Sequence, residues 1–152
     1  MSLVTLDIQK AFFDRRKIEN QVDRAAKGAL SKAGASVRRE QRGLIKRRKS
    51  RSKPGNPPHA HRKGLYSPKT ILFGYDRRSQ SVVVGMVKLA KSSVKGATPY
   101  PELMEKGGTA RIKSRRSRRR VKIAKRPSAK PALRLSIDRG DVIQPWENIL
   151  EP

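Results

Sequence analysis

An apolar repeat at helical spacing occupies the N-terminal part of the chain. Hydrophobic side chains recur there every three or four residues, which is the period of one face of an amphipathic helix. We therefore predict a helix over about residues 8–44, with Asp7 or Asp14 near its positively polarised start. Its apolar face comprises Ile8, Ala11, Phe12, Ile18, Val22, Ala25, Ala26, Ala29, Leu30, Ala33 and Val37. Its opposite face carries Arg15, Arg16, Lys17, Arg24, Lys27, Lys32, Arg38, Arg39 and Arg42.

Proline and glycine divide the remainder of the chain into short elements. Four such residues between Pro54 and Pro58 exclude a helix over residues 46–63 and predict a long loop. Residues 69–75 and 81–86 are rich in β-branched and aromatic side chains, which predicts a hairpin. Further along we predict a short helix over 101–105 that is stopped by Gly107 and Gly108. Strands at 110–112 and 121–124 are expected to follow, joined by a basic loop. The chain is then expected to form a helix over 131–139 that begins at Pro131, and an extended tail from residue 140.

Together these elements predict an α+β protein. The long N-terminal helix and the shorter helices are expected to pack on one face of a small antiparallel sheet. The length of 152 residues fits one domain. We predict this domain over residues 1–139, with basic loops at 46–64 and 113–126, followed by the extended C-terminal tail over 140–152.

Positive charge is in large excess. The chain has 38 Lys and Arg against 12 Asp and Glu, a net charge of +26 that favours polyanionic partners. Two runs concentrate it, Arg38 to Lys53 and Lys113 to Arg126. Few aromatic residues lie among these charges, so DNA binding would be non-specific and through phosphate. The alternatives are a solvated, disordered tract or contact with an acidic protein. The candidate contacts are Arg38, Arg39, Arg42, Lys46, Arg47, Arg48, Lys49, Arg115, Arg116, Arg118, Arg119 and Arg120.

The residue types needed for catalysis or metal binding are sparse. His59 and His61 have too few neighbouring ligands for a metal site, and we interpret them as loop histidines. Glu102 and Glu105 lie one helical turn apart, where capping, pairing with Lys106 or a subunit contact is favoured over cation binding. The acids form no cluster of the kind a metal-dependent nuclease needs. We predict no enzyme, catalytic residue, metal or cofactor.

The composition and the ends of the chain bear on where the protein acts. There is no cysteine, which excludes a disulfide framework and a thiolate site. The N-terminus does not resemble a signal peptide, and no stretch approaches the ~18 apolar residues of a membrane span. We expect a soluble protein that is not secreted, and we interpret Arg139-Gly140-Asp141 as a helix end and a turn rather than an adhesion motif.

The C-terminal residues have a different character from the basic runs. Trp146 lies among aliphatic and acidic residues, and no Lys or Arg follows Arg139. A lone Trp in such a setting is often an anchor on another surface. Ile149 and Leu150 accompany it. We favour docking of this segment on a neighbouring subunit over folding back onto its own domain.

Three motif blocks, read in order, give the chain a resemblance to a known family. They are the Pro-Gly block Ser52–Pro58, the Tyr-Glu-Gly block Pro99–Thr109 and the Arg-Pro block Arg126–Leu133. Their order and spacing resemble the head-tail joining and tail-completion (neck) proteins of long-tailed bacteriophages, over roughly residues 1–138. In that family the corresponding segments are a loop before a β-hairpin, the end of a short helix, and the start of a last helix. By motif, the residues that match are Pro54, Gly55, Pro57 and Pro58, then Tyr100, Glu105 and Gly107, then Arg126, Pro127, Pro131, Ala132 and Leu133.

The resemblance implies a structural virion protein at the head-tail junction, assembled in the host cytoplasm. Such proteins form a homo-oligomeric ring that joins connector to tail, with other neck, connector and tail proteins as partners and double-stranded DNA passing through the channel. Tyr100 and Glu105 join Trp146, Ile149 and Leu150 as the candidate subunit or partner interface. The alternatives are a non-specific nucleic-acid-binding protein of the ribosome or nucleoid and, less favoured, a metal-dependent nuclease.

The chain departs from the family pattern at three places. Ser128 stands where the family usually has an aromatic residue after Arg-Pro, so one expected anchor is missing. The segment His59–Leu65 replaces a Thr-Gly-x-Leu sequence, and the basic run Lys113–Arg126 is unusually dense for the family.

Overall fold

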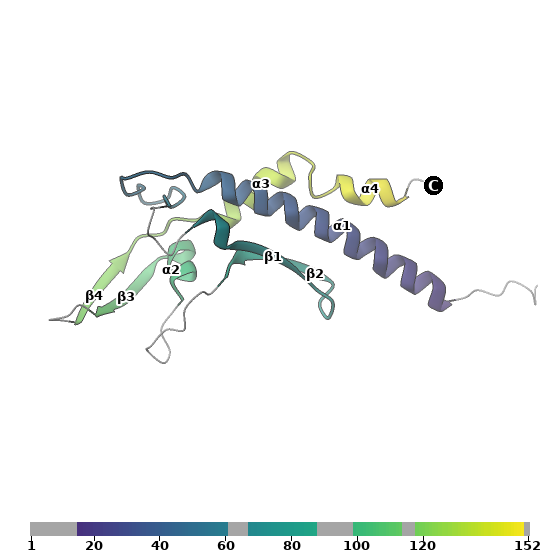
Figure 1. Cartoon of the computed structure of the whole chain (residues 1–152), viewed down its shortest axis with the longest axis horizontal. Coiled ribbons are helices and arrows are strands. Elements are labelled where there is room, and N and C mark those ends of the chain that lie inside the picture. The colour runs from purple at the N-terminus through teal and green to yellow at the C-terminus, as the bar shows by residue number, and fades with distance from the viewer. Residues whose placement is uncertain (1–14, 61–66, 88–98, 114–117, 151–152) are drawn as a thin grey trace, which may run out of the picture.

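The computed structural model describes residues 15–60, 67–87, 99–113 and 118–150 (Figure 1). Within them it confirms an α+β fold with a long N-terminal helix, several shorter helices and antiparallel strand pairs. The predicted helical residues 8–14 and the loop residues 61–63 lie outside the described part. None of the helices in the described ranges is long and apolar enough to cross a membrane.

Helix α1 (Arg15–Leu44) is the axis of the molecule and ends where the repeat predicted. Its buried side is lined largely by small residues, including Ala29, Ala33 and Gly34, which allow neighbouring elements to approach closely. Helices α3 (Ala129–Asp138) and α4 (Gln144–Leu150) pack along one side of α1, and the β1–β2 hairpin packs on the other (Figure 1). Helix α1 thus packs on the β1–β2 hairpin as predicted, whereas α3 and α4 pack mainly on α1 rather than on a sheet.

The first hairpin was predicted correctly. Strands β1 (Ile71–Asp76) and β2 (Ser81–Met86) pair antiparallel, after a short 3₁₀ turn, η2 (Pro68–Thr70). Alternate residues of β1 turn toward α1, since side chains alternate between the two faces of a strand. The contact is tight at Gly34, where an added Cβ would overlap Val82 and lie 3.0 Å from Phe73 Cδ2.

The second strand pair forms a separate sheet. Helix α2 (Tyr100–Lys106) leads through Gly107 and Gly108 into β3 (Gly108–Lys113), which pairs antiparallel with β4 (Arg118–Ile123). Both glycines have positive φ, 77° and 142°, as their predicted role in ending the helix requires. The basic run predicted as a loop over 113–126 is thus partly strand, because the cross-strand ladder continues through Arg118, Arg119 and Arg120.

A small apolar core links the two sheets. Ile45, Ala60, Ile71 and Met104 are buried together, and Val84, Met86 and Ile123 pack against them. The 46–60 loop therefore contributes to the core through Ala60, whose amide donates to the carbonyl of Lys46 at 3.0 Å.

The segment after α3 was predicted as an extended tail over 140–152, but residues 140–150 form a turn and a helix. Gly140 adopts a φ of 78°, the chain turns, and α4 runs back along α1. Pro145 lies in the first turn of α4, where its missing N–H carries no penalty. Helix α3 itself begins at Ala129, two residues before the predicted start at Pro131.

Candidate nucleic-acid and partner interface

Glu105 is part of a network of hydrogen bonds that also includes Ser128, Gln41 and Arg126, which we call the polar junction. The Oε1 atom of Glu105 accepts hydrogen bonds from the Ser128 amide (2.9 Å), the Ser128 hydroxyl (2.7 Å) and the Ala129 amide (3.0 Å), and its Oε2 lies 3.1 Å from the Ser128 amide. A carboxylate at a helix start satisfies free backbone N–H groups and complements the helix dipole. Glu105 of α2 therefore caps α3 from another element, which confirms the capping interpretation and uses both of its oxygens within the chain.

Ser128 extends this junction to α1. The residue is fully buried, and its hydroxyl also accepts a hydrogen bond from Gln41 Nε2 at 3.1 Å. Gln41 is itself only 2% exposed. At the position where the resembled family usually has an aromatic residue, this chain thus places a hydroxyl that joins α1, α2 and α3 through hydrogen bonds.

Arg126 ties the Pro-Gly block to the same junction. Its Nε donates to the Ser52 carbonyl at 3.1 Å, its Nη1 donates to the Ala124 carbonyl at 3.2 Å, and its amide donates to the Met104 carbonyl at 2.7 Å. The Gly55 amide donates to the Lys125 carbonyl at 2.8 Å, with Gly55 at a φ of 85°. The Arg-Pro block is therefore hydrogen-bonded to both of the other motif blocks, which lie far from it in the sequence.

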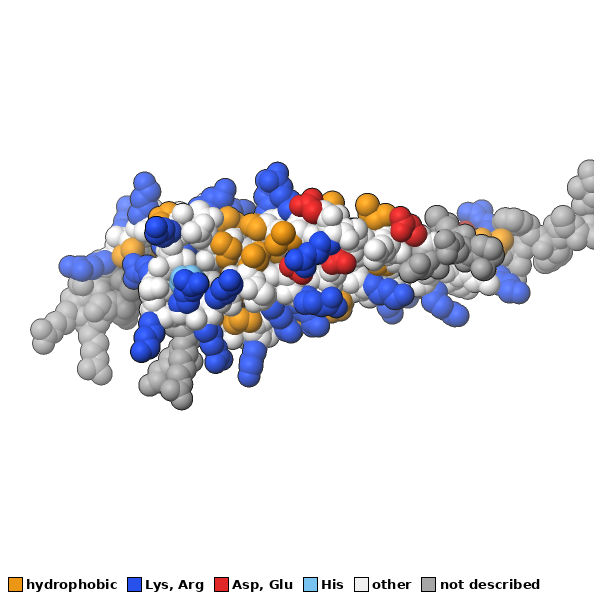
Figure 2. All heavy atoms as spheres, turned by 90° about the horizontal axis from the view of Figure 1, so that it is seen from above, with side chains coloured by type: hydrophobic (Ala, Val, Ile, Leu, Met, Phe, Trp, Pro, Cys, Tyr) orange, Lys and Arg blue, Asp and Glu red, His pale blue; other side chains and the backbone are white. Residues whose placement is uncertain are grey.

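This junction brings the two basic runs to one end of the molecule, which we call the basic end. It consists of the loop 45–60 and the β3–β4 ribbon, at the left of Figure 1. No Asp or Glu occurs in either segment. In Figure 2, Lys and Arg side chains surround this end, whereas the visible acidic side chains lie over the middle and right of the molecule. Among the side chains that the structure describes, its exposed cations are Lys46, Arg47, Arg48, Lys49, Arg51, Lys53, Arg111, Arg119, Arg120 and Lys122, and the exposed Lys125 follows β4 directly.

Two of the predicted contact residues have structural roles instead. Arg42 Nη2 donates to the Ile71 carbonyl at 2.9 Å, and the Arg38 guanidinium lies 4.9 Å from the centre of the Phe73 ring. Both hold the β1–β2 hairpin against α1. Arg39 is exposed on α1.

The other predicted contacts are spread between the loop and the ribbon. Lys46, Arg47, Arg48 and Lys49 are exposed in the loop, and Arg119 and Arg120 are exposed on β4. Arg118 begins β4, and Arg115 and Arg116 lie outside the described residues.

Sequence reasoning missed Arg111 and did not select Lys122. Arg111 lies directly across the ribbon from Arg120, and Lys122 lies across from Thr109. Basic and apolar residues alternate toward the end of 118–123, which is typical of a strand, but the charge run was interpreted as a loop.

Two of the predicted interface residues are exposed: Tyr100 is 46% exposed, and Trp146 is 39% exposed on α4. Ile149 and Leu150 lie in the same helix. Glu105 instead caps α3 within the chain. Leu133, Ile137 and Ile143 are also exposed along α3 and the α3–α4 turn. We call Leu133, Ile137, Ile143 and Trp146 the apolar α3–α4 surface.

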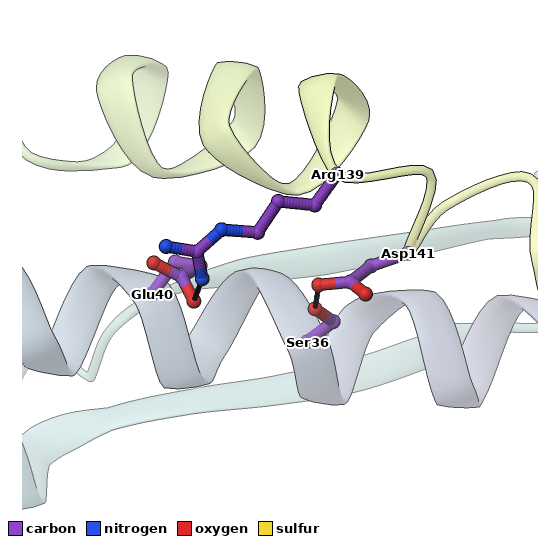
Figure 3. Close-up of polar contacts among 4 residues, drawn as sticks. All are labelled: Ser36, Glu40, Arg139 and Asp141. Atoms are coloured by element: carbon purple, nitrogen blue, oxygen red, sulfur yellow. Dashed lines mark hydrogen bonds and ion pairs between the residues drawn. The ribbon is translucent and has the colours of Figure 1, made fainter.

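Arg139-Gly140-Asp141 fastens the α3–α4 turn to α1 (Figure 3). Arg139 forms an ion pair with Glu40, and the Ser36 hydroxyl donates to Asp141 Oδ2 at 2.6 Å. Figure 3 shows both side chains of the turn reaching down to α1. These contacts confirm that the tripeptide is a helix end and turn, and they explain why the C-terminal segment folds back.

The remaining candidate sites are also accounted for by local contacts. His59 Nδ1 lies 2.9 Å from the Ser50 carbonyl oxygen, within the loop, and His61 lies outside the described residues. Glu102 pairs with Lys106 at 2.9 Å and raises the pKa of that lysine. Over the described ranges, no group of three or more His, Cys, Asp or Glu residues is placed to hold a metal ion.

Comparisons with known proteins return nothing similar. No protein-family model matches the chain, and neither the curated proteins nor the solved structures include a match.

Proposed function

We propose that this protein is a structural component of the head-tail junction of a tailed bacteriophage. In this proposal it forms a homo-oligomeric ring that joins connector to tail around the DNA channel, and it acts by assembly rather than catalysis. The partners are further copies of the chain, other neck, connector and tail proteins, and double-stranded DNA.

The observation that carries the proposal is the polar junction. The resemblance rests on three motif blocks. If the blocks matched the family only by chance composition, there would be no physical reason for them to contact one another in the fold. Here Arg126 of one block binds the Ser52 carbonyl of another, and Glu105 of the third caps the helix that follows Arg126. The blocks therefore form one interdependent unit, as expected of a signature that specifies a fold.

Two separate surfaces support an assembling protein that borders DNA. The basic end, with no acid in its loop or ribbon, suits a wall facing the phosphates of a DNA channel. The apolar α3–α4 surface lies on the other side of α1 from the β1–β2 hairpin and suits contact with a neighbouring protein subunit. A ring subunit needs both kinds of surface at once.

A second candidate is a non-specific nucleic-acid-binding protein of the ribosome or nucleoid. The basic end favours it equally, because phosphate neutralisation requires only clustered cations. The apolar α3–α4 surface has no role in that candidate.

Head-tail joining in vitro tests the proposal. A phage lacking this gene should yield DNA-filled heads and separate tails, and adding the purified protein should restore joined, infectious particles. Normal joined particles from the deletion phage would overturn the proposal. Protein with Leu133→Asp and Trp146→Asp should fail to restore joining, whereas Val83→Asp on the outer face of the β1–β2 hairpin, which is also exposed, provides a control for added charge.

A further inference from the structure

The β3–β4 ribbon has two chemically different faces. In an antiparallel pair, residues directly opposite each other point to the same side of the sheet, and the next pair points to the other side. The register places Arg111 opposite Arg120 and Thr109 opposite Lys122. These two pairs share one face, which we call the basic face. Two residues beyond Arg111 in β3, Lys113 is paired with Arg118.

The opposite face of the ribbon is apolar at its base, next to the body of the protein. Gly108 pairs there with Ile123, and Ala110 pairs with Val121, which is 38% exposed; Arg119 lies on this face nearer the tip. Ile123 packs against the core, and an added Cβ at Gly108 would lie 3.1 Å from Leu103 Cδ2 of α2. Because this face is directed inward at the base of the ribbon, the basic face is directed away from the body.

The ribbon holds like charges against each other without any compensating acid. Directly opposite side chains have Cβ atoms about 5 Å apart, and like charges at that spacing destabilise a strand pair. The sequence contains no Asp or Glu between Glu105 and Asp138. A sheet of only two strands has little other stabilisation, so a polyanion against the basic face would relieve the repulsion between Arg111 and Arg120.

We infer that the basic face of the β3–β4 ribbon binds the phosphate backbone of double-stranded DNA, with Arg111, Arg120 and Lys122 as the contacting residues. The inference deepens the proposed function and rests on it for the identity of the DNA. A two-stranded ribbon fits the major groove of a duplex, which is about 12 Å wide. The ribbon and the loop 45–60 contain no Phe, Tyr or Trp, so they offer no platform for stacking single-stranded bases.

The test compares two triple variants that remove the same charge from different hairpins. The ribbon variant carries Arg111→Gln, Arg120→Gln and Lys122→Gln. The control variant carries Lys69→Gln, Arg77→Gln and Arg78→Gln, whose side chains are exposed in η2 and in the turn between β1 and β2. Binding of each purified protein to a 30-base-pair duplex is measured by fluorescence anisotropy over a range of salt concentrations.

The salt dependence is the readout. Each phosphate contact contributes about 0.9 to the slope of log affinity against log salt, so the ribbon variant should lose about 2.7 from that slope. The control variant should lose less than about 1. Equal losses in the two variants, or no loss in the ribbon variant, would overturn the inference. Far-UV circular dichroism and the thermal midpoint of both variants exclude unfolding as the cause of a loss.

A competition arm separates DNA from an acidic protein surface. Polyglutamate at the same concentration of negative charge should displace the duplex only weakly. Its carboxylates do not reproduce the spacing of the phosphates along a DNA duplex. Displacement by polyglutamate at the concentration at which unlabelled duplex competes would overturn the inference in favour of an acidic protein partner. The slope is measured without phage, so its result is independent of head-tail joining. If the ribbon variant loses the expected salt slope but the unmodified protein does not join heads to tails, the proposed function is refuted and the DNA-binding inference stands.

Discussion

Removing the carboxylate of Glu105 should destabilise the fold far more than its position on a short helix suggests. Glu105→Ala leaves the Ser128 amide, the Ser128 hydroxyl and the Ala129 amide without this acceptor. Ser128 is fully buried, so water cannot replace the lost bond to its amide, at a cost of about 1–3 kcal/mol. Loss of a helix cap costs about 1 kcal/mol more. We expect a total loss of about 3 kcal/mol.

Glu102→Ala is the matched control, because Glu102 lies on the same helix and pairs with exposed Lys106. A solvated surface pair of this kind contributes little to stability, because water screens the attraction between the two charges. Glu105→Gln keeps one acceptor oxygen and should fall between the two alanine variants.

Urea unfolding followed by circular dichroism measures all three variants. With a slope of about 1.5 kcal/mol per molar urea, Glu105→Ala should lower the midpoint by about 2 M. Glu102→Ala should shift it by less than about 0.4 M. Equal midpoints for Glu105→Ala and Glu102→Ala would refute the reasoning that the junction holds the motif blocks together.

Three further predictions concern other parts of the fold. Gly28→Ala on the open surface of α1 should stabilise the protein by about 1 kcal/mol. The free energy of unfolding of Gly34→Ala should be about 1–3 kcal/mol lower than that of Gly28→Ala, because the added Cβ overlaps the hairpin, and equal urea midpoints for the two variants would contradict this. Arg120→Glu, opposite Arg111, should raise the thermal midpoint through about 0.2–1 kcal/mol of cross-strand attraction while weakening duplex binding, and a lower midpoint would refute the ribbon register. Hydrogen bonds from a serine hydroxyl and backbone amides hold the pKa of Asp76 below its ordinary 3.8. The ionised carboxylate therefore stabilises the fold fully above pH 3.8, and this stabilisation is lost as the pH falls through the lower pKa of the folded state. Asp76→Asn should remove this part of the acid sensitivity, and an unchanged pH profile of the thermal midpoint would contradict the prediction.

Local signals were sufficient for most of the individual elements. The apolar repeat in the N-terminal part of the chain predicted α1, and β-branched residues on either side of a polar turn predicted the β1–β2 hairpin. Pro101 and the pair Gly107 and Gly108 predicted α2 and its end. In each case the pattern reflects backbone preferences or one buried face, which are properties of neighbouring residues.

Elements that depend on distant contacts could not be predicted in this way. Helix α4 is seven residues long, too short to be stable alone, and it is held by the pairing of Arg139 with Glu40 and of Asp141 with Ser36. The start of α3 moved to Ala129 because Glu105, on another helix, caps it there.

The candidate site followed the same rule. Composition indicated two basic runs, but only the junction shows that they share one end of the molecule. Arg42 was indistinguishable in sequence from the exposed cations, yet its guanidinium binds the Ile71 carbonyl. The cross-strand register, which no single segment encodes, placed Arg111 opposite Arg120.

The most direct test of the proposed function is to determine whether the protein is present at the head-tail junction of a phage particle. Cryo-electron microscopy of particles, with the protein tagged after its C-terminal residue, should show tag density in a ring at the head-tail junction. Particles of normal composition and infectivity that contain no copy of the protein would contradict the account.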